Sequence, residues 1–423
     1  MTQPRKPILP GATIGILGGG QLGRMMAMAA RPLGYRVQVM DPDPSCPARF
    51  VVDACFEGGW NDARAAADLA RGCDVVTLEI EQVSLAALDA AQKYAPVRPG
   101  RALMGVVQDR ILQKSWLAEH GFPLGPWKAI ESESDLAEAA AELGGKLFVK
   151  SARGGYDGRS QVKIGFGESD ISNSRPFDKL RAGSGAPGTQ GADRSQVSES
   201  RPGAPEAWKL LGEKPCVAEA AVDLEKEISV MVARAPNGET KSFASAMNHH
   251  ENQILAWSVI PSSIPADMEA KAQEIACRIA MELGLEGLLA VEMFVTKPGA
   301  DGTSHLLVNE LAPRPHNSYH ASERACVTSQ FEQAVRAVCD LPLGDVSVVQ
   351  PAAIANLLGD LWFDEQGAPR EPRFDAALAV PGVRLHLYEK HNPRKGRKMG
   401  HLSAVGATPN EAVERVLEAQ RLL

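Results

Sequence analysis

Short apolar runs alternate with helix-like stretches over the first hundred residues of the chain. Thr13–Leu17 is an apolar run that ends at glycines, and a helical pattern follows it over Gln21–Arg31. Further strand-like runs lie at Tyr35–Met40 and Cys73–Ile80. Strands that alternate with helices in this way predict a parallel sheet with helical crossovers.

A second block of the chain begins near Asp109 and has a different pattern. Ser132 and Asp135 predict a capping box for a helix that stops at Gly144. Lys146–Lys150 is a strand-like run, and the glycine-rich segment SARGGYDGRS follows it directly. This order predicts a strand that delivers a lysine to a glycine-rich loop.

The second half of the block contains two nearly continuous apolar runs, Leu288–Thr296 and His305–Leu311. We expect both to be strands that are buried on two faces. Helical patterns precede and follow them, at Asp267–Leu283 and Thr328–Asp340. Shorter strands then lead to a terminal helix at Pro409–Leu422.

One segment, Ser172–Pro205, differs from its surroundings in composition. Of its 34 residues, 15 are Gly, Pro or Ser, and few are large and apolar. Such a stretch buries too little surface to offset the entropy lost on ordering. We expect a disordered-looking insertion between two strands with no catalytic role; the alternative is a loop that binds a partner.

Length and composition narrow the class of protein. A chain of 423 residues is too long for one compact core, so two or three domains are expected. The net charge of −7 argues against a nucleic-acid binder. We find no secretory signal and no apolar stretch of about 18 residues that would span a bilayer. The seven cysteines include no CxxC pair, so a reduced, cytoplasmic enzyme is the prediction.

The glycine motif at Gly18–Gly23 lies between a predicted strand and a predicted helix. It fits GxGxxG, and Asp41 ends the next strand, as in the dinucleotide fingerprint of an NAD-dependent dehydrogenase. However, the amino terminus of a helix favours any anion, so a phosphorylated nucleotide substrate would use the motif equally well. A third interpretation is that the glycines only allow a tight turn.

Charged residues at the ends of apolar strands give the strongest indication of a binding site in the sequence. Lys150 precedes the glycine-rich segment, where an ammonium group would neutralise phosphates. Glu292 and Glu310, with Asn309 beside the second, interrupt apolar strands that rarely admit carboxylates. Hard oxygen ligands of this kind would hold Mg²⁺. The alternative is that each glutamate pairs with an arginine, for which Arg314 is available.

The order of these features along the chain resembles an ATP-grasp enzyme, with Glu219–Val222 and Glu227 placed to bind adenine and ribose. Within that superfamily, GGYDGRS at 154–160 and NELAPRPHNSYH at 309–320 closely resemble signatures of the N5-carboxyaminoimidazole ribonucleotide synthase family. GGGQLGRM at 18–25, MDPDP at 40–44 and GRKMGHL at 396–402 also match that family. The resemblance covers nearly the whole chain except Ser172–Pro205.

The resemblance implies an α/β chain with an α+β ATP-grasp core and three domains. Residues 1–108 would form an amino-terminal, Rossmann-like pre-ATP-grasp domain with a doubly wound parallel sheet. Residues 109–340 would form the ATP-grasp domain, with a lid over about 109–215 that contains the insertion 172–205. Residues 341–423 would form a small carboxy-terminal domain.

The resemblance also implies the site residues, position by position. ATP would contact Arg110, Lys150, Gly155, Tyr156, Asp157, Gly158, Arg159, Ser160, Gln161, Glu219, Ala220, Ala221, Val222, Glu227, His250, Asn309 and Glu310. Magnesium would bind Glu292 and Glu310. The ribonucleotide substrate would contact Gly20, Gln21, Leu22, Glu79, Lys390, Arg397 and Lys398. The catalytic residues would be Tyr156, Asp157, Arg159, Arg314, His316 and Asn317.

The implied activity is that of a ligase of de novo purine biosynthesis. ATP would convert bicarbonate into carboxyphosphate, and the exocyclic amine of 5-aminoimidazole ribonucleotide would take the carboxyl group while Asp157 accepts the amine's proton. The enzyme would be a cytoplasmic homodimer that passes its product to the N5-carboxyaminoimidazole ribonucleotide mutase, with no nucleic acid or membrane as partner.

Two other classes remain as alternatives. A formate-dependent glycinamide ribonucleotide transformylase would share the ATP residues but should lack GGYDGR. A non-enzymatic nucleotide-binding regulator would need no magnesium carboxylates.

The chain departs from the family's usual pattern at three places. Ser160 and Tyr319 stand where the family usually has glycine, and one residue is extra between Lys390 and Arg397. Tyr319 is bulky beside the implied site, and the extra residue makes the alignment of Lys390 the least secure.

Overall fold

The computed structural model describes residues 6–154, 161–166, 203–300 and 302–423 of the 423-residue chain. The chain forms two compact units. The larger unit comprises residues 1–108, 226–295 and 305–423, and the smaller unit comprises residues 109–225 and 296–304. Within the described ranges, no helix is long and apolar enough to cross a membrane.

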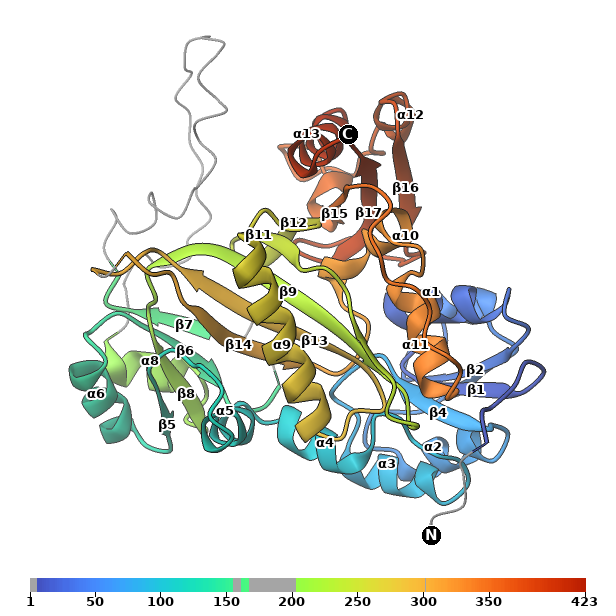
Figure 1. Ribbon diagram of the computed structural model, residues 1–423, viewed down its shortest axis with the longest axis horizontal. Coiled ribbons are helices and arrows are strands. Elements are labelled where there is room, and N and C mark those ends of the chain that lie inside the picture. Colours follow the sequence, from blue (N-terminus) through green and yellow to red (C-terminus); the bar gives the residue numbers. More distant parts are fainter. Residues whose placement is uncertain (1–5, 155–160, 167–202, 301) are drawn as a thin grey trace. The chain divides into compact units, whose positions relative to one another are not determined.

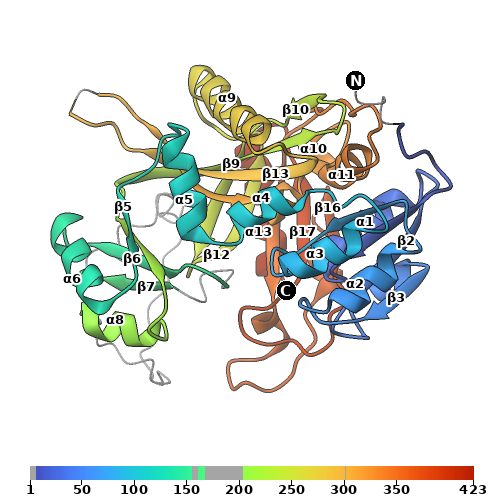
Figure 2. The same ribbon diagram turned by 90° about the horizontal axis from the view of Figure 1, so that it is seen from below.

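The first part of the larger unit is built on a parallel sheet of four strands in the order β3-β2-β1-β4. Its strands β2 and β3 are labelled in Figure 2. The strands are β1 Thr13–Leu17, β2 Arg36–Asp41, β3 Ala54–Glu57 and β4 Val75–Leu78, and the helices are α1 Gln21–Ala30, η1 Pro47–Val51, α2 Ala63–Ala70, α3 Leu85–Gln92 and α4 Arg101–Val107. The predicted elements are observed with ends that differ by at most two residues. The predicted parallel sheet is therefore confirmed.

A second, mostly antiparallel sheet of nine strands forms the rest of the larger unit (Figure 1). Its order is β14-β13-β9-β11-β12-β15-β17-β16, and β10 pairs with β9. The strands are β9 Leu224–Arg234, β10 Thr240–Ser242, β11 Ala246–Glu251, β12 Ile254–Ile260, β13 Gly287–Thr296, β14 Leu306–Ala312, β15 Ala352–Leu358, β16 Val383–Leu387 and β17 Lys398–Val405. The last three strands, from the carboxy-terminal part of the chain, thus extend the same sheet.

Helices cover this sheet and connect its strands. They are α9 Ala266–Glu282, η3 Asn317–Tyr319, α10 Ser322–Ala325, α11 Gln330–Val338, η4 Gly359–Trp362, α12 Phe374–Leu378 and α13 Pro409–Arg421. In α9 the buried positions Ile275 and Ile279 recur at helical spacing, and Gly284 follows the helix with φ +64°. The helices predicted at 267–283, 328–340 and 409–422 are confirmed.

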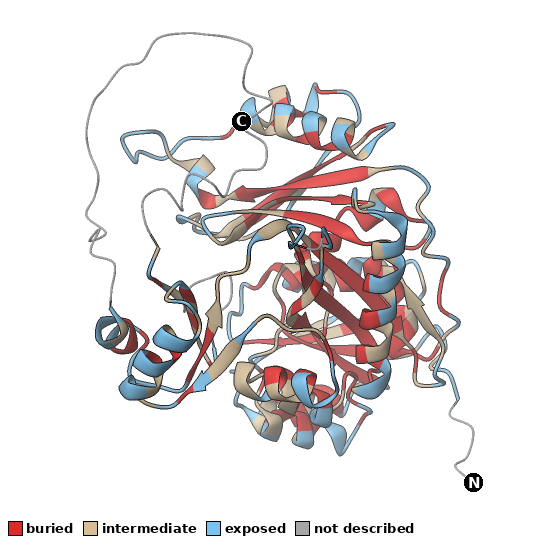
Figure 3. Cartoon of the chain, turned by 60° about the vertical axis from the view of Figure 1, so that its left-hand side comes forward, coloured by how far each residue is buried: buried red, intermediate tan, exposed pale blue. Residues whose placement is uncertain are grey.

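Strands β13 and β14 are buried on two faces only in part, so the prediction for them is wrong over half their length (Figure 3). Residues 287–291 are all buried, but from Glu292 onward every second residue is partly exposed. The partly exposed face carries the apolar Phe294 and Leu307 beside the polar Asn309. These large apolar side chains conceal the alternation in the sequence.

The described residues of the smaller unit form an antiparallel sheet in the order β5-β8-β6-β7 and three helices. Its elements are α5 Arg110–Glu119, β5 Trp127–Ile130, α6 Glu133–Glu142, β6 Leu147–Ser151, β7 Gln161–Ile164, α8 Ala204–Leu210 and β8 Cys216–Ala220. The capping box of Ser132 and Asp135 is formed as predicted. Leu136, Leu147 and Trp208 belong to the apolar core of this unit.

Candidate active site

Three charged side chains meet in the smaller unit beside the end of β6. Lys150 comes from β6, Glu219 from the neighbouring strand β8, and Lys114 from α5. Both ammonium groups lie 2.6 Å from the Glu219 carboxylate. The three side chains are only 6–16% exposed. Two cations therefore share one anion in a largely buried place.

This cluster combines two ammonium groups with one carboxylate. Burial alone would raise the pKa of Glu219, but Lys150 and Lys114 outweigh burial and lower that pKa to about 2. The carboxylate is thus ionised at neutral pH and pairs with both lysines. Two ammonium groups in one largely buried place favour an anionic ligand such as phosphate.

Lys150 and Glu219 were predicted from the sequence, whereas Lys114 was missed. Lys114 is 5% exposed and lies between Gln113 and Leu117 on the buried side of α5. A lysine on the buried stripe of a short amphipathic helix is unusual. The buried-side position of Lys114 is therefore the feature of the sequence that could have indicated its place in the charged cluster.

We expect the Glu219 cluster to make the smaller unit sensitive to acid. The folded pKa of about 2 lies below the ordinary value of 4.5. The stabilisation is therefore complete above about pH 4.5 and is lost as the pH falls toward 2. Urea unfolding should show the parent losing stability over this window more steeply than Glu219→Gln. Glu142→Gln is an exposed control from the same unit. If the free energy of unfolding of the parent and of Glu219→Gln fell in parallel with pH, the assignment of the acid sensitivity to Glu219 would be contradicted.

The start of the glycine-rich segment is tied to the beginning of α5. Arg110 donates hydrogen bonds to the carbonyl oxygens of Ser151 and Gly154, at 3.0 and 3.1 Å. Arg153 donates to the Asp109 carboxylate at 2.8 Å. The predicted residues that follow lie outside the described part of the chain: Gly155, Tyr156, Asp157, Gly158, Arg159 and Ser160. The described chain resumes at Gln161, which is paired with Lys150 across β6 and β7.

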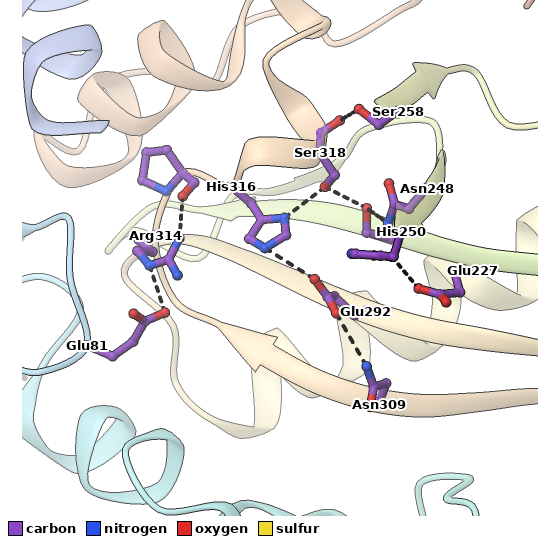
Figure 4. A network of polar contacts seen from close by, with 12 residues as sticks. Glu81, Glu227, Asn248, His250, Ser258, Glu292, Asn309, Arg314, His316 and Ser318 are labelled. Atoms are coloured by element: carbon purple, nitrogen blue, oxygen red, sulfur yellow. Dashed lines mark hydrogen bonds and ion pairs between the residues drawn. The ribbon is translucent and has the colours of Figure 1, made fainter. Parts of the chain in front are cut away.

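In the larger unit, two predicted carboxylates face each other across β13 and β14. Glu292 and Glu310 are direct register partners, next to an irregularity between Glu292 and Met293. The His316 imidazole lies 3.2 Å from one Glu292 oxygen, and the Asn309 amide donates to the other at 3.4 Å (Figure 4). Like charges directly opposite on two strands are destabilising unless a cation lies between them. The two carboxylates therefore fit Mg²⁺, which prefers hard oxygen ligands.

Two further ion pairs line the same network. Nδ1 of His250 lies 2.6 Å from the Glu227 carboxylate (Figure 4). Burial lowers the pKa of His250, but Glu227 outweighs burial, so the net shift is upward. Arg314 lies 2.7 Å from Glu81, in the segment that follows β4. The guanidinium group is thereby held at a defined place beyond the end of β14.

Asn317 is buried and yet unsatisfied. Asn317 is 7% exposed, and neither polar atom of its side-chain amide has a hydrogen-bond partner among the residues that the structure describes. An unpaired buried amide carries a desolvation penalty. Its position next to His316 therefore suits a ligand group or an ordered water.

Internal carboxylates accept hydrogen bonds from three N–H groups of the glycine loop before α1. Gly20 and Gly23 donate to the two oxygens of Glu79, both at 2.6 Å, and Gly19 donates to Asp41 at 2.8 Å. A Cβ on Gly20 would lie 2.4 Å from a Glu79 oxygen, so the glycine is required for this contact. Binding of the nucleotide substrate at Gly20, Gln21 and Leu22 stays a prediction.

The predicted substrate residues of the larger unit have defined surroundings. Burial raises the pKa of Glu79, while the Lys390 ammonium acts in the opposite direction, so the two groups are electrostatically coupled. Lys390 donates to the carbonyl oxygen of Lys398 at 2.9 Å. Arg397 donates to two carbonyl oxygens of the preceding loop. Leu22 is a core residue of α1.

Three family profiles match the chain. The ribonucleotide synthetase preATP-grasp domain matches residues 11–108, the ATP-grasp domain matches residues 189–331, and the phosphoribosylaminoimidazole carboxylase C-terminal domain matches residues 352–415.

Full-length relatives decide the family. The N5-carboxyaminoimidazole ribonucleotide synthase of Bacillus subtilis is 36% identical over 97% of this chain and 95% of its own. The chain belongs to the N5-carboxyaminoimidazole ribonucleotide synthase family. A crystal structure of a family member with ADP matches with a TM-score of 0.81 at 36% identity, covering 99% of this chain and 98% of that one. The Aspergillus clavatus enzyme, solved with ADP and 5-aminoimidazole ribonucleotide, gives 0.79 at 26% identity, covering 97% and 98%.

Membership of the N5-carboxyaminoimidazole ribonucleotide synthase family confirms the predicted family, the α/β ATP-grasp fold class and the enzyme class, an ATP-grasp ligase. ATP as the nucleotide of this class is also confirmed. The dehydrogenase alternative is wrong, because the glycine motif belongs to the preATP-grasp domain.

One departure from the family pattern has a simple structural explanation. Tyr319 is fully buried, and its hydroxyl lies 2.8 Å from the Ser229 carbonyl oxygen and 2.9 Å from that of Ala244. Its ring packs edge-on against Phe243. The side chain therefore points into the core, and its bulk does not crowd the Glu292 network.

A histidine cluster in the larger unit has the composition of a metal site but the geometry of a packed core. Ligand atoms of Glu323, His386 and His401 all lie within 4.8 Å of one another. However, the two imidazole rings stack with an interplanar angle of 13°, so their in-plane lone pairs do not converge on one ion. His401 is hydrogen-bonded to Tyr388, and burial lowers the pKa of His401 well below its usual value. These contacts indicate a structural role.

Proposed function

We propose that this chain carboxylates the exocyclic amine of 5-aminoimidazole ribonucleotide to N5-carboxyaminoimidazole ribonucleotide, using ATP and bicarbonate. The observation that carries the proposal is the largely buried cluster of Lys114, Lys150 and Glu219, whose two ammonium groups suit the phosphates of ATP. A relative in the same family was solved with ADP and this ribonucleotide, which supports the identity of the substrate.

The first step activates bicarbonate, whose carbon is a poor electrophile without a leaving group. Lys150 neutralises the phosphate oxygens of ATP while the γ-phosphoryl group is transferred to bicarbonate. Glu292 and Glu310, with Asn309, would hold Mg²⁺, which would supply charge stabilisation for the transferred group. The product of this step is carboxyphosphate.

The nucleoside part of ATP is recognised by other groups. Backbone groups of Glu219–Val222, at the end of β8, bind adenine, and Arg110 lies at the start of the same unit. The Glu227 carboxylate accepts hydrogen bonds from the ribose, with His250 holding its orientation.

In the second step the amine nitrogen forms a bond to the carboxyl carbon of carboxyphosphate, whose bond to the phosphate oxygen breaks, and inorganic phosphate leaves. Arg314, held by Glu81, binds the anionic carboxyl donor, and the Asn317 amide and His316 donate hydrogen bonds next to it. Asp157 accepts the amine's proton, with Tyr156 and Arg159 beside it; these three lie outside the described residues. Exclusion of water protects carboxyphosphate from hydrolysis.

The ribonucleotide substrate binds near the glycine loop in the larger unit. Glu79 accepts a hydrogen bond from the substrate at the Gly20–Leu22 turn, and Lys390, Arg397 and Lys398 bind its phosphate. The coupling between Glu79 and Lys390 supports this placement.

The same proposal includes the domain organisation and the oligomeric state of the chain. Residues 1–108, 109–340 and 341–423 are its three domains, and the chain acts as a homodimer. Its product passes to the N5-carboxyaminoimidazole ribonucleotide mutase.

An omission assay tests the proposal. We expect ADP release and carboxylated nucleotide only when ATP, bicarbonate and the aminoimidazole nucleotide are all present. Formate replaces bicarbonate in a parallel reaction. ADP release with formate and glycinamide ribonucleotide, and none with bicarbonate, would assign the chain to the transformylase reaction instead.

A further inference from the structure

An ion pair joins the glycine-loop helix to the segment that carries Lys390. The two terminal nitrogens of Arg24, in α1, donate to the two carboxylate oxygens of Glu389 at 2.7 and 3.0 Å. Arg24 also donates to the Pro47 carbonyl oxygen at 3.0 Å, and its side chain is only 10% exposed. The partners are 365 residues apart in the chain. A planar guanidinium that meets a carboxylate through two bonds fixes both distance and orientation.

The backbone at Glu389 is held in an unfavourable conformation. Its φ is +55°, in the left-handed region that residues with a Cβ rarely adopt. The preceding residue, Tyr388, is fully buried and hydrogen-bonded to His401. The turn at Glu389 therefore begins next to a buried, hydrogen-bonded side chain. The backbone conformation of this turn determines the position of Lys390.

Lys390 is placed by this turn. Its ammonium lies 5.5 Å from the centre of the Tyr388 ring and donates to the Lys398 carbonyl oxygen at 2.9 Å. It is also coupled to Glu79, which binds the first turn of α1 through Gly20. Arg24 lies four residues after Gly20 on the same helix.

The pair also controls charge at the proposed phosphate site. Without Arg24, the Glu389 carboxylate would be an uncompensated anion next to Lys390. It would repel a phosphate and compete for the lysine. With Arg24 in place, the carboxylate is paired, so it competes less with the substrate's phosphate for Lys390.

We propose that Arg24 and Glu389 form a positioning pair that sets Lys390 for the phosphate of the ribonucleotide substrate. The inference rests on the proposed function, which assigns that phosphate to Lys390. Neither residue of the pair contacts the reacting atoms; both act through Lys390.

The test measures steady-state kinetics of Glu389→Gln and Glu389→Gly in the full chain. We expect the KM for the aminoimidazole nucleotide to rise about 10-fold in both variants, because two charge-assisted hydrogen bonds are weakened or lost. The KM for ATP should stay within about 2-fold of the parent value. Glycine removes the strain at φ +55°, so Glu389→Gly should remain folded and its Tm should not fall as far as that of Glu389→Gln. Glu286→Gln is the matched control, because Glu286 pairs with the buried Arg98 at 3.1 Å.

A double-mutant cycle with Lys390→Met separates the two proposals. If Glu389 acts through Lys390, Glu389→Gln has no further effect on the nucleotide KM when Lys390 is already methionine. Additive effects of the two substitutions would overturn the positioning role and leave the phosphate role of Lys390 intact. An unchanged nucleotide KM in Lys390→Met would instead overturn the phosphate role itself. A shift in the nucleotide KM of Glu286→Gln equal to that of Glu389→Gln would also overturn the positioning role.

Discussion

Glu310→Gln should reduce turnover by about 10³-fold or more and leave the fold intact. Loss of one carboxylate ligand removes most of the affinity for Mg²⁺, and the metal supplies several kcal/mol of charge stabilisation during phosphoryl transfer. The fold should survive because Glu310 directly faces Glu292. Replacing one of two facing carboxylates by a neutral side chain of the same shape relieves a repulsion. In the absence of Mg²⁺ the variant should therefore unfold at the same temperature as the parent or higher.

The measurement is ADP release over a Mg²⁺ titration, together with thermal unfolding with and without the metal. In the parent, Mg²⁺ with nucleotide should raise the Tm, whereas in Glu310→Gln this shift should largely disappear. Glu282→Gln is the control, because Glu282 lies in α9 and pairs with Arg278 on the same helix. A Mg²⁺ dependence identical to that of the parent would remove Glu310 from the metal site.

The parts of the fold that the sequence predicted are those governed by local pattern. The helix over α9 follows from its spacing of apolar residues, and the capping box of Ser132 and Asp135 from two residues three positions apart. Glu292 and Glu310 could be singled out because carboxylates on apolar strands are costly. The cross-strand register that makes them direct partners could not be read from the chain.

The missed features depend on contacts between distant residues. Glu79 is 59 residues from Gly20, and nothing in the glycine motif indicates that an internal carboxylate occupies the helix terminus. The partial exposure of β13 was hidden because Phe294 lies on the exposed side. Likewise, the continuity of the carboxy-terminal strands with the main sheet depends on pairing between β12 and β15, which no local pattern specifies.

Lys150→Met should lower kcat/KM for ATP by about 10²-fold or more while the smaller unit stays folded. The physical reason lies in the shared carboxylate. When Lys150 is removed, Lys114 and Glu219 remain as a buried ion pair. One of the two ammonium groups is lost, and with it part of the attraction for phosphate. Nucleotide binding by calorimetry and steady-state ADP release would measure the two effects separately.

Three variants of the cluster distinguish direct contact from net charge. Lys150→Met and Lys114→Met leave the same net charge, so equal losses of ATP affinity would mean that only the charge matters. A much larger loss for Lys150→Met, with Lys114→Met affected by about 10-fold or less, would place the phosphate at Lys150. Glu219→Gln removes the carboxylate that both ammonium groups contact, which should destabilise the protein by about 3–5 kcal/mol in the absence of nucleotide. An anion should then restore much of that loss, so saturating ATP should raise the Tm of Glu219→Gln more than that of the parent. No such gain would contradict an anion site at the cluster.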